Sequence, residues 1–245
     1  MVGLNAQTED FYNRYLMSYP QTAFTACEAP FKWQAADWLK AGGVLVIGSS
    51  LYFLDEDIGT IVKRNRSPLT HRVADAGNLI GNGWYTIPVV GVTWLGGYVF
   101  NSPKTKDTAL LSVKSLLIAD GITSALKYST QRYRPNRHRG NAFWSSKGFS
   151  RHKDSFPSGH TTLVWSIAPV IAEQYKETAW VPPLAYGIAC VTGYSRIHDE
   201  KHWASDVFVG AVIGYCTAQL VLHTTPRLSI TPTSESIGVQ VGWLF

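Results

Sequence analysis

The chain has 245 residues, a formal net charge of +5, 16% charged residues and 13% aromatic residues. Soluble domains have about a quarter of their residues charged, so this chain is poor in charge. Its mean hydropathy, close to zero, is nevertheless low for a chain made mostly of membrane spans. The three cysteines have no paired spacing, which excludes a disulfide framework. A membrane-embedded protein and an apolar soluble protein both stay open.

Residues 1–30 are polar and aromatic without a clear period, which predicts an N-terminal tail or a segment that lies on the surface. Within this tail, residues 1–6 are a candidate remnant of a signal peptide, with cleavage after Ala6 in the stretch V-G-L-N-A-Q. No charged region and no long apolar region accompanies this stretch, so it indicates a leader only weakly.

Six apolar stretches follow the tail, and none of them alternates strictly as a strand would. Stretches of about 14 to 22 residues make helices of about 21–33 Å, whereas a bilayer needs about 20 residues. Several stretches are therefore short for a span. The sequence predicts one all-α domain over residues 31–226, a six-helix bundle whose surroundings stay open, with helices at roughly 41–54, 79–100, 108–126, 160–174, 179–195 and 204–222.

The segment 227–245 has a different pattern from the apolar stretches before it. Its apolar residues, among them Ile237, Val239 and Val241, alternate with small or polar residues. This period of two is typical of a strand and predicts a short C-terminal strand in a separate tail.

Lys127, at the end of the third apolar stretch, is followed seven residues later by Arg134 and Pro135. A proline disfavours helical geometry in the residue before it, so Arg134 is expected to be extended. An ammonium and a guanidinium can then point at one anion, the guanidinium with bidentate geometry. Taken alone, the block is equally well explained by two solvated cations at a helix end.

The second block, Pro157–Ser158–Gly159–His160, opens the fourth apolar stretch. Glycine lets a ligand approach the backbone, and the first N–H groups of a helix together with its dipole form an anion site. His160 would stand at the mouth of this site. The alternative is an ordinary helix cap with an incidental histidine.

The third block contains Ser195, Arg196, then His202 and Asp206. His202 and Asp206 are four residues apart and would share one face of a helix. A carboxylate that accepts from one ring nitrogen leaves the other nitrogen as a nucleophile or base, and Arg196 adds a phosphate-binding cation. A purely structural hydrogen bond is the alternative for this pair alone.

Taken in order, K-X6-R-P, P-S-G-H and S-R-X5-H-X3-D match every specified position in the signature of the phosphatidic acid phosphatase type 2 superfamily, which the chain resembles. The motifs extend from Lys127 to Asp206, and the helical pattern extends the resemblance over roughly residues 31–226. The two tails carry none of it. The resemblance implies the six-helix bundle of the phosphatidic acid phosphatase and haloperoxidase type.

The resemblance also implies which residues bind the phosphoryl oxygens: Lys127, Arg134, Ser158, Gly159 and Arg196. Three cations and a helix N-terminus can neutralise a transferring phosphoryl group without magnesium. The sequence shows no cluster of carboxylates suited to a two-metal site. We therefore expect neither a metal nor a cofactor.

For catalysis, the resemblance implies that His202, oriented by Asp206, attacks phosphorus and forms a phosphohistidine. His160 is implied to protonate the leaving alcohol and then to deprotonate the water that hydrolyses the intermediate. The expected activity is hydrolysis of phosphomonoesters or of a lipid diphosphate.

Further basic and acidic residues precede the second block, and they form either a rim for the substrate headgroup or a solvated loop. They are Arg132, Arg137, His138, Arg139, His152, Lys153 and Asp154.

The superfamily contains membrane lipid phosphatases, soluble periplasmic acid phosphatases and vanadium-dependent haloperoxidases. Tyr175, Trp180 and Tyr186 would suit an interfacial belt at the end opposite the motifs. We therefore favour a membrane-associated lipid phosphatase of the cell envelope, with its active site facing the periplasm. Its partners would be a phosphorylated lipid and the membrane, and not nucleic acid.

A soluble periplasmic non-specific acid phosphatase and a vanadium-dependent haloperoxidase stay open as alternatives. Six spanning helices together with a cleaved signal peptide would place the pocket in the cytoplasm. The signal-peptide and periplasmic hypotheses are therefore compatible only with a bundle that does not fully span.

Overall fold

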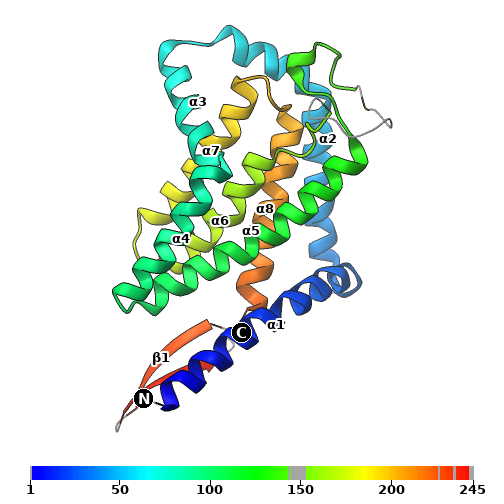
Figure 1. Ribbon diagram of the computed structural model, residues 1–245. Coiled ribbons are helices and arrows are strands. Elements are labelled where there is room, and N and C mark those ends of the chain that lie inside the picture. Colours follow the sequence, from blue (N-terminus) through cyan, green and yellow to red (C-terminus); the bar gives the residue numbers. More distant parts are fainter. Residues whose placement is uncertain (1, 143, 145–152, 226, 234–235, 243–245) are drawn as a thin grey trace.

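The computed structural model describes residues 2–142, 144, 153–225, 227–233 and 236–242 of the chain. The first helix crosses beneath the others, and the long helix Pro103–Thr130 runs obliquely across the bundle (Figure 1). The described residues contain the α-helices α1 (Val2–Lys32), α2 (Ala35–Arg64), α3 (Pro68–Gly81), α4 (Gly83–Val99), α5 (Pro103–Thr130), α6 (Gly159–Gln174), α7 (Val181–His198) and α8 (Ala204–Thr224).

The predicted all-α class is confirmed, and the six predicted stretches correspond to α2 and α4 to α8. The described residues contain two further helices, α1 and α3, because α1 was expected as a tail and only the last residues of α3 fell within a predicted stretch, 79–100. Asn82 ends α3, and its side-chain oxygen accepts from the backbone N–H of Trp84 at 3.1 Å, which starts α4. This cap interrupts the apolar run 79–100, so one predicted helix is the end of one element and the start of another.

The segment expected as an N-terminal tail is helix α1 in the structure. Within residues 13–32, where the structure describes the side chains of α1, the buried ones are Tyr15, Ser18 and Thr22, which are 5%, 1% and 0% exposed. Two of these side chains are polar, so the face has no apolar period for the sequence to reveal. Helix α1 is fixed by Lys114 of α5, whose ammonium donates to the Ser18 carbonyl at 3.1 Å and to the Thr225 hydroxyl at 2.8 Å.

The C-terminal segment forms two strands, β1 (Arg227–Thr233) and β2 (Ser236–Gly242), where one strand was expected. They pair antiparallel, with Arg227 opposite Gly242. The hairpin lies at the same end of the molecule as α1, and β1 contacts α5 (Figure 1).

Helix α6 lies at the centre of the bundle and packs against α5, α7 and α8. Its contact with α8 is close because α8 presents glycines there. A Cβ atom at Gly210 would lie 2.7 Å from the Ser158 carbonyl oxygen, and one at Gly214 would lie 2.6 Å from the Thr162 carbonyl oxygen. The two backbones therefore touch at the start of α6, which brings the second and third blocks together.

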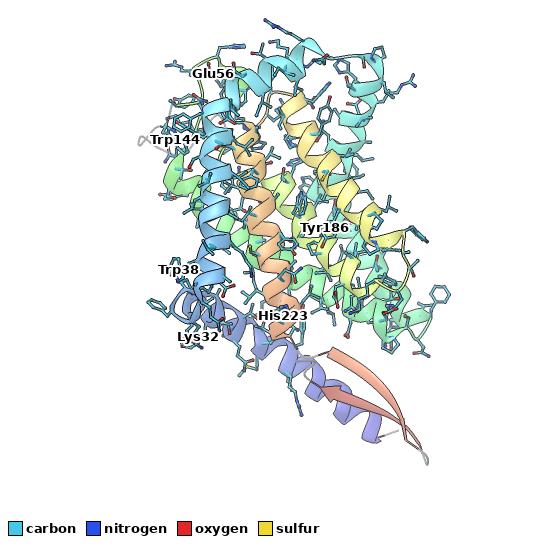
Figure 2. All side chains as sticks on the ribbon, turned by 180° about the vertical axis from the view of Figure 1, so that it is seen from behind. Lys32, Trp38, Glu56, Trp144, Tyr186 and His223 are labelled. Carbon is cyan, nitrogen blue, oxygen red and sulfur yellow. The ribbon has the colours of Figure 1, made fainter. Side chains whose placement is uncertain are left out.

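Large apolar side chains cover the outer faces of α2 and α4. Phe53 is 79% exposed and Trp84 is 87% exposed, and Trp38 on α2 points away from the bundle (Figure 2). Cys190 and Cys216, which stand in apolar runs and would be buried in a soluble core, are exposed as well. Exposed apolar surface of this extent is typical of a protein or membrane contact. By length and composition, two of the described helices, α5 and α8, could cross a membrane.

Candidate active site

The three blocks meet at one end of the bundle, the end remote from α1 and the hairpin (Figure 1). Lys127 lies in the last turn of α5 and His160 in the first turn of α6. Arg196 lies in the last turn of α7 and Asp206 in the first turn of α8. His202 belongs to the connection between α7 and α8. Antiparallel neighbours thus bring together residues that are far apart along the chain.

The three predicted phosphate-binding cations lie near both histidines. Lys127, Arg134 and Arg196 are all electrostatic neighbours of His160 and of His202. The Lys127 side chain also reaches α6, since a Cβ atom at Gly159 would lie 3.7 Å from its Cε atom. The predicted convergence of cations and imidazoles is therefore present in the structure.

Arg134 and Lys127 share a neighbour, Asp154, for which the sequence left open a headgroup rim or a solvated loop. The carboxylate of Asp154 accepts from Arg134 Nε at 2.8 Å and from Arg134 Nη2 at 3.0 Å. Lys127 Nζ donates to the backbone carbonyl of the same residue. Asp154 is thus part of the site itself.

Arg196 is held from a helix that carries none of the motifs. Its Nη1 atom donates to the side-chain oxygen of Asn78 on α3, and Asn78 Nδ2 donates to Asp199 at 2.6 Å. Arg196 is 7% exposed, and its Nε atom is buried without a hydrogen-bond partner among the described residues. Asn78 was missed from the sequence, because a single polar residue in an amphipathic helix gives no signal.

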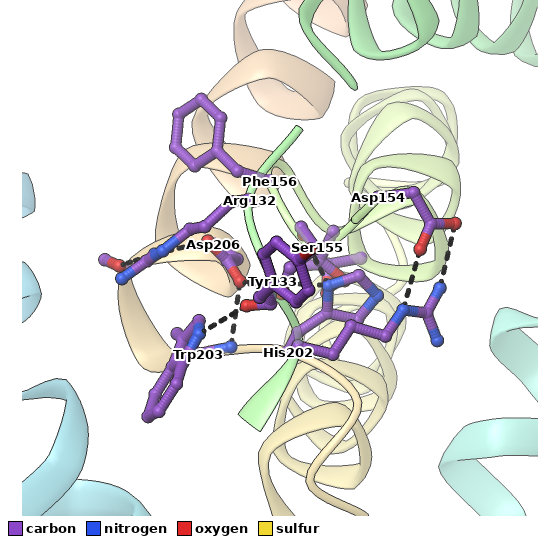
Figure 3. Close-up of polar contacts among 12 residues, drawn as sticks. Arg132, Tyr133, Asp154, Ser155, Phe156, His202, Trp203 and Asp206 are labelled. Atoms are coloured by element: carbon purple, nitrogen blue, oxygen red, sulfur yellow. Dashed lines mark hydrogen bonds and ion pairs between the residues drawn. The ribbon is translucent and has the colours of Figure 1, made fainter. Parts of the chain in front are cut away.

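His202 is 2% exposed, and its Nδ1 atom lies 2.6 Å from the backbone carbonyl oxygen of Ser155 (Figure 3). The nearest carboxylate oxygen of Asp206 is 3.9 Å from Nδ1. The expected direct hydrogen bond between Asp206 and His202 is therefore replaced by one to Ser155. A carbonyl oxygen can only accept, so Nδ1 carries the hydrogen and Nε2 keeps its lone pair.

Asp206 is completely buried and bonded on both oxygens. Its Oδ1 atom accepts from Arg132 Nη1 at 2.6 Å. Its Oδ2 atom accepts from the Ser155 hydroxyl at 2.6 Å and from the backbone N–H of Trp203 at 2.9 Å. The first turn of α8 and the segment before α6 are joined through this one carboxylate (Figure 3).

Arg132, expected from the sequence in either a headgroup rim or a solvated loop, is 0% exposed. Besides Asp206 it bonds to Asp55 of α2 at 2.7 Å and to the Ser205 hydroxyl at 2.8 Å. Asp55 is 1% exposed and also accepts from the backbone N–H of Ser205 at 2.9 Å. Two buried carboxylates here share one guanidinium, which explains why a charged residue sits inside the bundle. Asp55 was not predicted as part of the site.

The remaining members of the predicted rim lie around Tyr133 and the turn that follows Arg134. The guanidinium of Arg139 and the ammonium of Lys153 each lie 5.8 Å from the ring centre of Tyr133. His138 lines a cavity of about 310 Å³ between α2 and the α7–α8 connection, and His202 lines it too. Arg137 is the last residue of the short 3-10 turn Pro135–Arg137. His152 lies outside the described residues.

The second block forms the start of α6 as predicted. Ser158 is the N-cap residue, but its side chain does not cap the helix. Its hydroxyl instead accepts from Thr161 at 2.9 Å, and its backbone N–H donates to the Asp206 carbonyl at 3.0 Å. N–H groups in the first turn are therefore left for another acceptor, as an anion site requires.

The surroundings of His202 keep its ring neutral. Burial first, and then the positive charges of the three cations, holds the pKa of His202 well below its ordinary value, although the bond to the Ser155 carbonyl acts in the opposite direction. The neutral ring, with Nδ1 protonated and Nε2 free, is the form that can act as a nucleophile.

The sequence is similar to known phosphatases and to one transport protein. A family model described as the PAP2 superfamily matches residues 108–230. The chain is 30% identical over 138 residues to a lipid A 1-phosphatase from Porphyromonas gingivalis, covering 56% of this chain and 28% of that protein. It is 41% identical over 76 residues to the bacitracin transport permease protein BcrC from Bacillus licheniformis, covering 31% of this chain and 36% of that protein.

A probable diacylglycerol pyrophosphate phosphatase 1 from Schizosaccharomyces pombe is 34% identical over 90 residues, covering 32% of this chain and 32% of that protein. The chain thus spans about a third of the length of the curated relatives that it matches.

Two solved structures have a similar fold. The crystal structure of Aquifex aeolicus LpxE superposes with a TM-score of 0.54 at 25% identity, covering 69% of this chain and 94% of that one. A transmembrane PAP2 type phosphatidylglycerolphosphate phosphatase from Bacillus subtilis gives a TM-score of 0.57 at 23% identity, covering 73% of this chain and 92% of that one. Since the family model covers all three blocks and half of the residues, the chain belongs to the PAP2 superfamily.

Proposed function

We propose that the protein is a metal-independent phosphatase that hydrolyses a phosphorylated membrane lipid through a phosphohistidine intermediate. The observation that carries this proposal is the convergence of Lys127, Arg134 and Arg196 around the two histidines. Three fixed cations and a helix N-terminus suit a tetrahedral anion of two negative charges. The donor set matches phosphoryl transfer, in which positioning and charge stabilisation provide most of the catalysis.

In the first step, the lone pair of His202 Nε2 attacks phosphorus. A nitrogen–phosphorus bond forms while the bond from phosphorus to the lipid oxygen breaks. His160 gives a proton to the leaving oxygen. Burial and the three cations lower the pKa of the free His160 ring to about 4, and the negative charge of a bound phosphate beside it favours the protonated form. The three cations stabilise the equatorial phosphoryl oxygens throughout.

In the second step, a water molecule attacks the phosphohistidine. His160, now neutral, takes a proton from this water, the nitrogen–phosphorus bond breaks and inorganic phosphate is released. His202 returns to its neutral form with Nδ1 protonated, and His160 is ready to act as an acid again. No step requires a metal ion or a redox cofactor.

A lipid substrate is supported by the outer surface of the bundle. The exposed apolar faces of α2 and α4 and the span-capable α5 and α8 suit a bilayer. Relatives named as a lipid A 1-phosphatase and a diacylglycerol pyrophosphate phosphatase act on phosphorylated lipids, as their names state. We infer that the alcohol side of the substrate is a lipid.

We further propose that the protein lies in the membrane of the cell envelope with its active site on the periplasmic side. The site and the N-terminal helix lie at opposite ends of the bundle (Figure 1). Labelling of a cysteine introduced at the partly exposed residue Lys201, by an impermeant thiol reagent on intact cells, tests this orientation. Labelling only after the cells are opened would contradict it.

The function is tested by assaying the purified protein in detergent against a panel of substrates. The panel contains phosphatidic acid, phosphatidylglycerol phosphate, an isoprenyl diphosphate, lipid A phosphate and a soluble aryl phosphate. We expect at least one lipid to be hydrolysed with a much higher kcat/KM than the aryl phosphate, and acid-labile phosphate to be trapped on His202 by rapid quenching. Preference for the aryl phosphate would instead favour a non-specific acid phosphatase, and halide oxidation with bound vanadate a haloperoxidase.

A further inference from the structure

Asp154 and Ser155 are consecutive residues that belong to none of the three blocks, yet both contact the predicted catalytic and phosphate-binding groups. Asp154 accepts from Arg134 and Lys127. Ser155 accepts from His202 and donates to Asp206 (Figure 3). We propose that this pair is a positioning element of the active site, in which Asp154 orients the phosphate-binding cations and Ser155 fixes the tautomer of the nucleophile. The proposal rests on the proposed function.

Asp154 engages only one edge of the Arg134 guanidinium. The Nε and Nη2 hydrogens point at its two carboxylate oxygens, at 2.8 and 3.0 Å, which fixes the plane of the group. A guanidinium has five N–H donors, so Nη1 and the outer hydrogen of Nη2 form a second edge. That edge remains to bind phosphoryl oxygens with bidentate geometry. A pair in which the side chains are 22% and 17% exposed is shielded enough from water to hold this orientation.

The charge of Asp154 also lowers the net charge around the phosphoryl group. The three cations contribute three positive charges, and the Asp154 carboxylate offsets one of them. A site with the full charge of the cations would bind inorganic phosphate, the product, more tightly than the reaction needs. Asp154 therefore aids turnover in two ways, by orienting Arg134 and by weakening product binding.

Ser155 is 0% exposed and all three of its polar groups are bonded. Its backbone N–H donates to the Arg132 carbonyl at 3.0 Å, its hydroxyl donates to Asp206 Oδ2 at 2.6 Å, and its carbonyl accepts from His202 Nδ1 at 2.6 Å. The first two hydrogen bonds fix the position of the Ser155 peptide group, and the carbonyl of this residue orients the His202 imidazole. Asp206 thus acts on His202 through Ser155. The Ser155 carbonyl can only accept a hydrogen bond, so it keeps the hydrogen of His202 on Nδ1.

The tautomer of His202 tests the role of Ser155 without any assay of turnover. In wild-type protein labelled with ¹⁵N-histidine, with the His202 signals assigned by comparison with His202→Gln, the ring nitrogen shifts should show hydrogen on Nδ1 and a bare Nε2. Hydrogen on Nε2 would overturn the proposal. Since the measurement uses the wild-type chain, it decides the point even if variants of Ser155 fail to fold.

The variant Ser155→Ala removes the hydroxyl that ties the peptide to Asp206. Misplacing a reacting group by about 1 Å costs on the order of a hundredfold in rate, so kcat should fall by about that factor. KM should stay unchanged because no phosphate-binding cation is touched. Ser155→Thr, which keeps the hydroxyl, should retain most of the rate, and Ser129→Ala on the exposed end of α5 is the matched control. An unchanged kcat in Ser155→Ala, or a loss that appears only in KM, contradicts the positioning role.

The variant Asp154→Asn should change kcat and phosphate inhibition in opposite directions, which a merely disordered active site would not do. We expect kcat to fall on the order of tenfold to a hundredfold, because Arg134 loses its bidentate partner. Inhibition by inorganic phosphate should become stronger at the same time, because the net positive charge rises. Asp154→Glu should restore weak phosphate inhibition, and Asp57→Asn on the exposed face of α2 is the matched control. Weaker phosphate inhibition in Asp154→Asn, or an unchanged kcat, would overturn the assignment.

The wild type is assayed on the lipid panel beside these variants, so that two failures are told apart. No turnover by the wild type rejects the proposed function itself. Turnover by the wild type together with unchanged kcat in Ser155→Ala and Asp154→Asn rejects only the positioning element.

Discussion

Single residues at this site depend on partners that the motifs do not contain. His202 is oriented by a backbone carbonyl 47 positions away in the chain, and Asp206 by an arginine 74 positions away. In the proposed mechanism the motif residues supply the reacting groups, and these residues are held by contacts with Ser155, Arg132 and Asp55. Backbone groups of this kind bear no signature in a motif, because any residue type carries a carbonyl.

Replacing His202 by alanine should abolish turnover, because no intermediate can form without its nitrogen. Removing a nucleophile costs several orders of magnitude in kcat, so we expect a loss of about 10³-fold or more. The measurement is steady-state hydrolysis of the best lipid substrate, with vanadate binding as evidence that the pocket is intact. Activity near that of the wild type would show that another group attacks phosphorus.

The pH dependence of kcat/KM should reflect the low pKa of His202. Burial and the neighbouring cations lower this pKa, so the neutral nucleophile persists at pH values where an ordinary histidine, with a pKa of about 6.5, is already protonated. Activity due to this group is therefore present above the lowered pKa and is lost as the pH falls through it. A pH profile of the free enzyme with its acidic limb below about pH 6.5 is expected, and a limb well above that value would contradict it.

The same shift has a consequence for stability. Since the folded-state pKa lies below the unfolded one, the unfolded chain takes up the proton first as the pH falls. The stability contributed by neutral His202 is thus present above the unfolded pKa and decreases below it.

Arg132 should be essential for stability. Replacing it by alanine leaves Asp55 and Asp206 buried without their shared cation, and breaking a buried ion pair in this way costs about 3–5 kcal/mol. Thermal unfolding in detergent should show a large loss, while Arg72→Ala on the exposed side of α3 should change little. Equal stabilities of the two variants would mean that the buried network is not what holds this end of the bundle.

At the scale of elements, the site exists because helix ends are brought together by close backbone packing. Helices α6 and α8 touch at the glycines of α8, which places the start of α6 beside Asp206. The apolar periods in the sequence identify these helices but give no indication of which faces meet. The polar face of α1 gives no indication even of a helix.

The contact between α6 and α8 should tolerate no side chain at Gly214. A Cβ atom there would lie 2.6 Å from the Thr162 carbonyl oxygen, so Gly214→Ala should destabilise the protein by about 1–3 kcal/mol. Gly187→Ala, on α7, is the control, because nothing lies within 4 Å of its new Cβ atom and alanine favours the helix by about 0.5–1 kcal/mol. Comparison of their unfolding temperatures checks the prediction. A Gly214→Ala variant as stable as Gly187→Ala would show that the helices are not in close contact.

At the scale of the whole molecule, the cations and the apolar surface lie in different places. The three cations lie at one end of the bundle, whereas the exposed apolar residues of α2 and α4 cover its sides. This division suits a protein that takes a phosphate group from water and its lipid from a bilayer.

The reaction should proceed without a divalent metal. An excess of chelator is expected to leave kcat unchanged, because three side-chain cations stabilise the negative charge of the phosphoryl oxygens. Vanadate should compete with the substrate, since it adopts the five-coordinate geometry of the transition state. The check is the initial rate with and without chelator, and a strict requirement for magnesium would contradict the mechanism.

The sequence by itself determined the all-α class, the family and the residue types of the site. Helices have a period and catalytic groups have a fixed spacing, and both can be read along one chain. Only the tertiary structure decided that Arg132 is buried, that Ser155 rather than Asp206 meets His202, and that the N-terminal tail is a helix docked by Lys114. These features depend on polar groups that pair across the fold, and pairing between distant positions has no periodic trace in the sequence.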